Sequence, residues 1–242
     1  MISVSSGIFP IVLRSSAMTA AVAPAAAPSD RTRIRRVAQR ASYERTTLEA
    51  IVDAAHVCHV AFADANGVHC IPTACWRDGA HLYIHGSNGS RMLKLAAAGA
   101  QACVTITHLD GLVLARSAFN HSMNYRSAMI YGSFEVVPDA DKAHALDVFL
   151  EQLAPGRSRE ARPGSAKELA ATTVLRIGFG EAVTKVRTGG PNDDEADLAL
   201  PLWAGVLPFG VARVAPVPDA GPGAMPDAAP GYVQDWEATI VA

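Results

Sequence analysis

The segment Tyr83-Ile-His85-Gly-Ser-Asn-Gly-Ser90-Arg91 contains the residue types of a phosphate-binding turn. An extended run is followed by a Gly/Ser/Asn loop and then by the first residues of a helix. Free backbone N–H groups at a helix start, the Ser90 hydroxyl and the Arg91 guanidinium together suit a phosphate monoester. Taken alone, the segment is better explained by a serine that caps its helix and by a solvated arginine.

Two later segments carry other donor-rich chemistry. Residues 120–127, Asn-His-Ser-Met-Asn-Tyr-Arg-Ser, suit the carbonyl and nitrogen edge of a planar heterocycle, although alone they are better explained as a polar turn. Lys185 and Arg187 alternate on an extended run and therefore share one face, and Trp203 offers a flat surface for a ring. The acidic run at 193–197 is typical of a solvated loop rather than of a calcium site.

Composition excludes several classes of protein. The chain has 242 residues, of which 50% are hydrophobic, and a formal net charge of -2. There is enough apolar surface for a core, but no basic field for nucleic acid and no apolar run of the roughly 20 residues that a membrane helix needs. Walker, Gly-x-Ser-x-Gly, His-Glu-x-x-His and Gly-x-Gly-x-x-Gly motifs are absent from the sequence, so nucleoside-triphosphatase and hydrolase functions lose their usual anchors.

Four cysteines, Cys58, Cys70, Cys75 and Cys103, stand apart without a Cys-x-x-Cys pair. This spacing favours buried free thiols in a reducing cytoplasm over a disulfide framework, and it predicts no metal site. We therefore expect a cytoplasmic protein with neither a nucleic-acid nor a membrane partner.

The elements that must position these residues are mostly strands. Apolar residues at helical spacing predict helices over 47–55, opened by Thr46 or Thr47, over 90–98, and over 139–153, capped by Asp139. Extended apolar runs and turn signals predict a hairpin of 57–62 with 68–76 and strands at 81–85, 101–107 and 125–137. A last strand is expected over 173–186, with a bulge or bend at Gly178 and Gly180. Consecutive strands with inserted helices predict a mainly β fold with peripheral helices, a small closed or half-open barrel.

The two ends differ from this middle in composition. We expect a disordered extension over residues 1–30, with Met1 or Met18 as the start, a single domain over 31–210, and an extended Pro/Gly/Ala-rich tail over 211–242 whose Tyr232 and Trp236 could dock on a partner subunit. Residues 57–62 have only His59 as a polar member, so both faces of that strand are apolar. A half-open barrel with such strands predicts a homodimer.

Six segments in register resemble one known family. They are His69-Cys-Ile-Pro72-Thr-Ala-Cys-Trp76, residues 83–95, Asp110-Gly-Leu-Val-Leu-Ala-Arg-Ser117, Asn124-Tyr-Arg-Ser127, Lys185-Val-Arg-Thr-Gly189 and Trp203-Ala-Gly205. In order and spacing, between about Arg40 and Pro208, they look like the pyridoxamine 5'-phosphate oxidase-like FMN-binding split barrels, in the flavin-nucleotide-binding and nitroimidazole-resistance-like branch.

The resemblance implies a homodimer with FMN in a groove at the subunit interface. It implies that the strand with Cys70, Ile71, Pro72 and Thr73 contacts the flavin ring through its backbone, and that Ile84 and His85 lie near the ring or ribityl chain. It also implies that Ser90 and Arg91 hold the phosphate and that Ser127 faces the flavin edge. The cofactor-binding set is completed by Arg126, Lys185, Arg187 and Trp203. No catalytic side chain is assigned. Met92 stands where many relatives have a lysine, so one phosphate cation is missing.

The implied activity is that of an FMN-dependent oxidoreductase on a small planar or nitro-aromatic substrate, with the hydride carried by the flavin. Two alternatives stay open because of Met92. One is a non-catalytic flavin- or haem-binding redox or carrier module, and the other is a deazaflavin-dependent reductase. The arginine-rich phosphate site of the vitamin-forming oxidase is not evident near the C-terminus, where Arg213 precedes a Pro/Gly tail.

Overall fold

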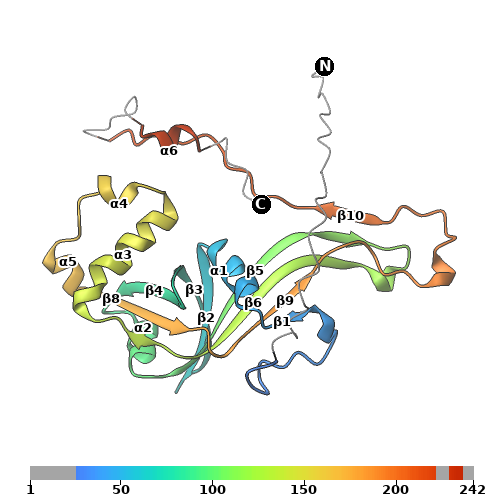
Figure 1. The fold of residues 1–242 in the computed structure, drawn as a ribbon, viewed down its shortest axis with the longest axis horizontal. Helices are drawn as coiled ribbons and strands as arrows, with labels where there is room; N and C mark the ends of the chain where they lie inside the picture. Colours follow the sequence, from blue (N-terminus) through green and yellow to red (C-terminus); the bar gives the residue numbers. More distant parts are fainter. Residues whose placement is uncertain (1–25, 222–228, 237–242) are drawn as a thin grey trace, which may run out of the picture.

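The computed structural model describes residues 26–221 and 229–236, and its centre is one antiparallel sheet (Figure 1). The strands are β1 (Ala41–Ser42), β2 (Val57–Asp64), β3 (Gly67–Asp78), β4 (His81–Ser87), β5 (Gln101–Leu114), β6 (Ser122–Ser133), β7 (Glu135–Val136), β8 (Thr172–Gly178), β9 (Ala182–Arg187) and β10 (Gly205–Pro208). They run in the order β1-β9-β6-β5-β2-β3-β4-β8-β7, and β10 pairs with β5. This is the mainly β split barrel expected from the sequence.

Helices lie around the sheet. They are α1 (Arg45–Asp53), α2 (Arg91–Ala97), α3 (Asp139–Leu153), α4 (Arg157–Glu160), α5 (Ala166–Ala170) and α6 (Gly231–Gln234), with short 3-10 turns η1 (Ala38–Arg40), η2 (Ala118–Asn120) and η3 (Glu195–Asp197). In α1, Leu48, Ile51 and Val52 recur at helical spacing and are buried in the main core with the inward side chains of the strands. The helix therefore closes one side of the curled sheet.

A second, smaller core lies under α3. Trp76 of β3 and Tyr83 of β4 stack with ring centroids 5.6 Å apart, and Phe149 of α3 lies 5.0 Å from Trp76. Val174 of β8 and Ala145 of α3 are buried in the same cluster. Aromatic packing thus holds α3 on the sheet face opposite the main core.

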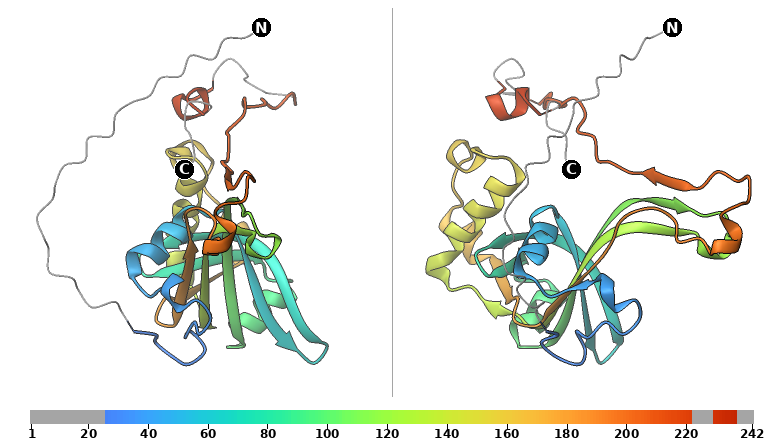
Figure 2. Two further views of the ribbon diagram at one scale, coloured as in Figure 1. Left: turned by 90° about the vertical axis from the view of Figure 1, so that its right-hand side faces the viewer. Right: turned by 45° about the vertical axis from the view of Figure 1, so that its right-hand side comes forward.

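Strands β5, β6 and β10 extend away from the barrel as a long ribbon (Figures 1 and 2). The pairing of β5 with β2 ends at Thr105, while residues 106–114 continue for about 30 Å of strand. Beyond the barrel β5 pairs with β6 on one side and with β10 on the other. We call residues 109–125 and 188–208 the arm.

Several expectations for the elements are confirmed and others are wrong. The hairpin, the strand at 81–85, the helix capped by Ser90 and the bounds of the helix over 139–153 are confirmed. The helix expected over 47–55 begins earlier, after Glu44, and Pro138 rather than Asp139 caps α3. The strand expected to end at Thr107 runs to Leu114, and the one expected over 125–137 spans Ser122–Ser133.

The strand expected over 173–186 is two strands. β8 pairs with β4 and β7, whereas β9 pairs with β6 and β1, so the glycines at 178 and 180 mark a crossing between two parts of the sheet rather than a bulge.

The expected boundaries of the domain can be followed only in part. Residues 1–25 lie outside the described chain. Ser29 of the expected extension bonds to Glu181 of the barrel, as does Arg31 at the start of the expected domain. In the expected tail, α6 carries Tyr232, whose hydroxyl donates to Glu160 of the same chain at 2.6 Å. No helix of the described chain is long and apolar enough to cross a membrane.

The four cysteines are free, as expected, but not all are buried. Cys58 and Cys75 are buried in the core, Cys103 is half-buried and Cys70 is exposed. The exposed thiol follows from the alternation of β3, which turns Cys70 outward.

Candidate flavin-binding site

Arg91 belongs to a three-residue cluster at the tip of the β2–β3 hairpin. Its Nη1 lies 3.3 Å from Asp64 Oδ2, and its Nη2 lies 3.3 Å from His69 Nδ1. Asp64 Oδ1 accepts hydrogen bonds from the Asn66 amide at 2.7 Å and from His69 Nε2 at 2.9 Å. Because a guanidinium only donates, His69 must accept at Nδ1 and donate from Nε2. The ring therefore connects the carboxylate to the arginine.

The electrostatics of this cluster leave part of Arg91 available. The hydrogen bond from His69 and the Asn66 amide hold the pKa of Asp64 below its ordinary value, so the carboxylate is ionised. The Arg91 side chain is 54% exposed, and its contacts to Asp64 and His69 are at the long end of the hydrogen-bond range. A second anion can therefore bind the outer side of the guanidinium.

The loop before Arg91 is fixed to neighbouring elements. Ser90 caps α2 by accepting from the Leu93 amide at 3.4 Å. Asn88 donates to the Ala170 carbonyl at 2.7 Å and accepts from the Thr173 hydroxyl at 2.7 Å. Met92 points into the main core, so a cation at that position would have to leave the core to reach a phosphate. Arg91 is therefore the cation that this turn presents to solvent, and Lys94 is exposed further along α2.

Strand β3 has an open edge next to this cluster. Residues 67–74 pair with β2, but β4 pairs with β3 only at Cys75–Asp78. No strand of the described chain pairs with the other edge of residues 67–74, which include Cys70, Ile71, Pro72 and Thr73. Proline is tolerated at such an edge because it has no N–H to donate. The backbone groups of this edge are those that the resemblance assigns to the flavin ring.

Ile84 and His85 lie away from that edge. Ile84 is fully buried in the main core, whereas His85 lies between Trp76 and Phe149 under α3. Burial lowers the pKa of His85, and its Nδ1 is buried without a hydrogen-bond partner in the described chain. The ring is therefore neutral with one nitrogen unused.

Four of the other predicted residues, Arg126, Ser127, Lys185 and Arg187, form a second group at the root of the arm. Within one chain it lies on β6 and β9, separated from β3 by β2 and β5. Ser127 donates to the Lys185 carbonyl at 3.1 Å, and Lys185 Nζ donates to the Arg36 carbonyl at 3.3 Å. Trp203 lies apart from this group, because its neighbour Gly205 pairs with Leu114 at the far end of β5. It is exposed and lies over Gly205, where an added Cβ would come within 2.9 Å of the indole.

The two arginines of this group already have partners. Arg126 forms a two-pronged ion pair with Asp110 at 2.9–3.2 Å, which raises the pKa of Arg126. Arg187 is buried, and it donates to Asn124 and to the carbonyls of Gly189 and Gly190. Burial, and then the charge of Arg40, lower the pKa of Arg187. Sequence reasoning missed Asp64 and Asp110 as partners, because the pairing of β5 with β6 brings Asp110 to Arg126, and the packing of α2 beside the β2–β3 hairpin brings Asp64 to Arg91.

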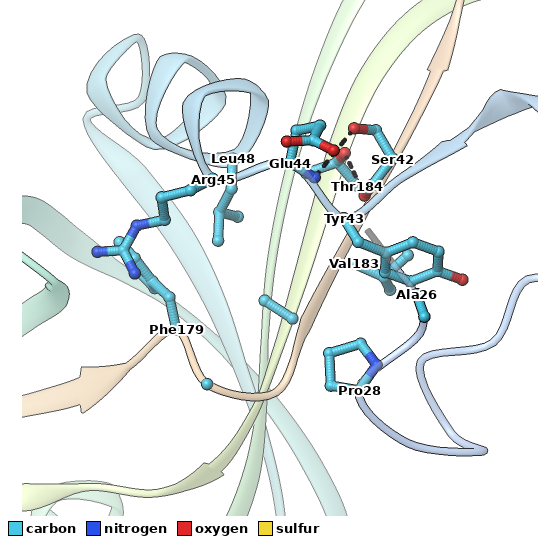
Figure 3. A pocket seen from close by; sticks show the side chains of 12 residues that line it. Ala26, Pro28, Ser42, Tyr43, Glu44, Arg45, Leu48, Phe179, Val183 and Thr184 are labelled. Carbon is cyan, nitrogen blue, oxygen red and sulfur yellow. Dashed lines mark hydrogen bonds between the residues drawn. The ribbon is translucent and has the colours of Figure 1, made fainter. Parts of the chain in front are cut away.

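A separate hollow of about 310 Å³ lies between the N-terminal segment, the start of α1 and the β8–β9 turn (Figure 3). Arg45 lies over the Phe179 ring on one side, with Cζ 4.6 Å from the centroid. On the other side the Thr184 hydroxyl donates to the Ser42 carbonyl at 2.9 Å. None of the predicted cofactor-binding residues lines this hollow.

Comparison with known proteins decides the family. The family described as Pyridoxamine 5'-phosphate oxidase matches residues 44–186, more than half of the chain. The chain belongs to this family. None of the curated proteins matches the chain.

Two solved structures are similar over most of this chain. One is the flavocytochrome Anf3 from Azotobacter vinelandii, at 41% identity and a TM-score of 0.81, covering 87% of this chain and 98% of that one. The other is the FAD and haem binding protein from Mycobacterium smegmatis, at 36% identity and a TM-score of 0.78, covering 84% and 98%. Both matches extend beyond the 44–186 core of the family.

Proposed function

We propose that this chain is a homodimeric redox protein that binds a flavin and a haem. The observation that carries the proposal is the similarity to a flavocytochrome and to an FAD and haem binding protein over more than four-fifths of this chain and nearly all of theirs. The open β3 edge beside Arg91 supports the flavin half. When both groups are bound, the flavin accepts or donates electron pairs and the haem iron exchanges single electrons.

The flavin that we propose is FAD rather than the FMN implied by the sequence resemblance. The relative from Mycobacterium smegmatis is described as FAD-binding, and both flavins carry a phosphate that suits the exposed side of Arg91. The backbone of residues 70–73 would orient the ring, and Ser90 with Arg91 would hold the phosphate. His69 keeps Arg91 in place through its contact at 3.3 Å.

His121 fits the needs of a haem-iron ligand, and His85 meets one of them. A ligating imidazole is neutral, and its second nitrogen is commonly held by a hydrogen bond. His121, at the end of the arm, has Nδ1 held 3.0 Å from the Ser117 carbonyl, which leaves Nε2 for a ligand. His85 is kept neutral by burial, but its unused Nδ1 is itself buried beside Trp76 and Phe149, so an iron could reach it only if these rings moved. The exposed Phe119, two residues before His121, offers apolar surface to a porphyrin, whereas Trp76 beside His85 is fully buried.

A homodimer would explain why the predicted cofactor-binding residues form two separate groups in one chain. The group on β3 and α2 and the group at the root of the arm lie on different strands of one chain. In a groove shared by two copies, the first group of one copy would face the second group of the other. The flavin would then lie at the interface, where the sequence resemblance puts it.

An absorption spectrum of the purified full-length protein tests the cofactors. We expect flavin bands and a haem Soret band in about equal amounts, with FAD released on denaturation. Flavin without haem would favour the oxidoreductase acting on a small planar or nitro-aromatic compound, and a deazaflavin spectrum would favour the reductase of that type. Replacing His85 or His121 by Phe, one at a time, then assigns the iron ligand from the change in the Soret band.

A further inference from the structure

The arm is an uncovered surface in its own chain. It projects from the barrel with no helix or strand lying over its length (Figures 1 and 2). Eight of the sixteen exposed large apolar side chains of the described chain belong to it: Leu109, Phe119, Met123, Leu198, Leu200, Leu202, Trp203 and Leu207. A two-stranded ribbon alone is at best marginally stable in water, and exposed apolar side chains gathered on such a ribbon are typical of an interaction surface.

The arm is nevertheless a built structure. Asp193 has only 1% of its side chain exposed and accepts from the Arg116 amide and from Arg116 Nη1, both at 2.8 Å. Arg187 and Asn124 hold the carbonyl of Gly189 at the start of the same loop. These contacts fix the loop over 188–204 to the end of the β5–β6 ribbon. Such preorganisation lowers the entropy cost of binding a partner.

Charges at the end of the arm complement another part of the chain. The turn at η3 carries Asp194, Glu195 and Asp197, and none has an ion-pair partner among the described residues. Arg35, Arg36 and Arg40 of the N-terminal segment likewise have none there. The two sets are well separated within one chain, with η3 at the far end of the arm (Figure 1). They can therefore meet only between two copies.

We propose that the arm is an interaction surface for a second copy of this chain, with the acidic turn of each arm on residues 35–40 of the other subunit. This rests on the proposed homodimer and adds the surface that holds it together. A two-fold dimer makes the contact twice, because each copy offers both halves. The apolar side chains of the arm would then lie on the partner barrel, whose outward Val57 and Val68 are also exposed. An anionic membrane would instead repel the acidic turn.

Charge reversal tests the contact directly on the full-length protein. The turn variant is Asp194→Lys with Glu195→Lys, and the segment variant is Arg35→Glu with Arg36→Glu; all four side chains are exposed, so folding is not at risk. Sedimentation equilibrium should show each variant dimerising about tenfold or more weakly than the unaltered chain at low salt. An equimolar mixture should recover the affinity, because in the mixed dimer both contacts pair opposite charges.

The apolar half has its own control. Phe119→Ser should weaken the dimer, whereas Val217→Ser should not, since both side chains are 92% exposed but Val217 lies beyond the arm. Variants that dimerise as tightly as the unaltered chain would overturn the arm contact while leaving the homodimer standing. A monomer that still holds its cofactors would overturn both the homodimer and the arm contact, but not the flavin and haem. Binding of the arm to anionic vesicles with no effect on self-association would show a membrane surface instead.

Discussion

Replacing Arg91 by Ala should weaken the binding of phosphate-bearing flavins. The guanidinium has more than half of its surface exposed, and the contacts that hold it, to Asp64 and His69, are both 3.3 Å long. A phosphate can therefore draw it outward without first breaking a short ion pair. The affinity lost in Arg91→Ala is then that of the charge-assisted bond between Arg91 and the phosphate, and the rest of the site stays intact.

The size of the effect follows from that geometry. A charge-assisted hydrogen bond contributes about 1.5–3 kcal/mol, which corresponds to a loss of about one to two orders of magnitude in affinity. The Asp64 carboxylate offsets part of the arginine charge, so we expect the lower end, about tenfold. Replacing Asp64 by Asn removes that competing charge but can still accept from the Asn66 amide. This variant should bind FAD and FMN more tightly than the unaltered chain.

Calorimetric titration of the flavin-free protein with FAD, FMN and riboflavin measures these differences. Riboflavin has no phosphate, so its affinity should change little in either variant. Lys94→Ala is a matched control, because Lys94 is an exposed cation on the same helix. Equal losses for FAD and riboflavin, or no loss for FAD, would refute the placement of the phosphate and leave the Ser90-Arg91 turn as a helix cap.

Three further outcomes follow from the structure. Burial lowers the pKa of His85 in the folded chain, so the unfolded chain takes up the proton first as pH falls through about 6.5, and the stability of the fold should decrease there. In His85→Phe the melting temperature should depend less on pH between pH 8 and 5. A pH profile equal to that of the unaltered chain would contradict the burial argument. Gly111→Ala should detach β10 from β5, because the added Cβ would come within 2.8 Å of the Leu207 carbonyl, and hydrogen exchange of residues 205–208 should therefore rise. The control Gly180→Ala should leave that exchange unchanged, because its Cβ meets open space. Asp193→Ala should raise hydrogen exchange across residues 188–204 with little change in the melting temperature. Asp193→Asn keeps an acceptor for the amide of Arg116, so its increase in exchange should be smaller. Loss of the whole fold would show instead that the arm and the barrel unfold together.

Local signals predicted the elements whose partners are near in sequence. The β2–β3 hairpin could be predicted because Asp64-Ala-Asn-Gly67 is turn chemistry between two extended runs. The bounds of α3 followed from apolar residues at helical spacing between Pro138 and Pro155. In both cases the residues that determine the element lie within it or beside it.

Elements that depend on distant partners were predicted less well. Residues 108–114 contain Asp110-Gly111, which resembles a turn, but pairing with β6 and β10 keeps them extended, with only a shift of register at Asp110. The split between β8 and β9 is similar. The glycines at 178 and 180 signalled an interruption, yet only the strands on either side show that the chain crosses to another part of the sheet.

In the candidate site, too, distant partners decide what the sequence alone leaves open, namely which cations are free to bind a phosphate. The sequence shows four cations in the predicted cofactor set, Arg91, Arg126, Lys185 and Arg187, without showing which are already paired. Asp110 occupies Arg126, and the carbonyls of Gly189 and Gly190 occupy Arg187, so neither can bind a phosphate without breaking contacts that fix the root of the arm. Arg91 and Lys185 remain, one in each group of the divided site. If two copies bring these groups together, a flavin phosphate would find one cation from each copy, and flavin binding would strengthen the dimer by mass action.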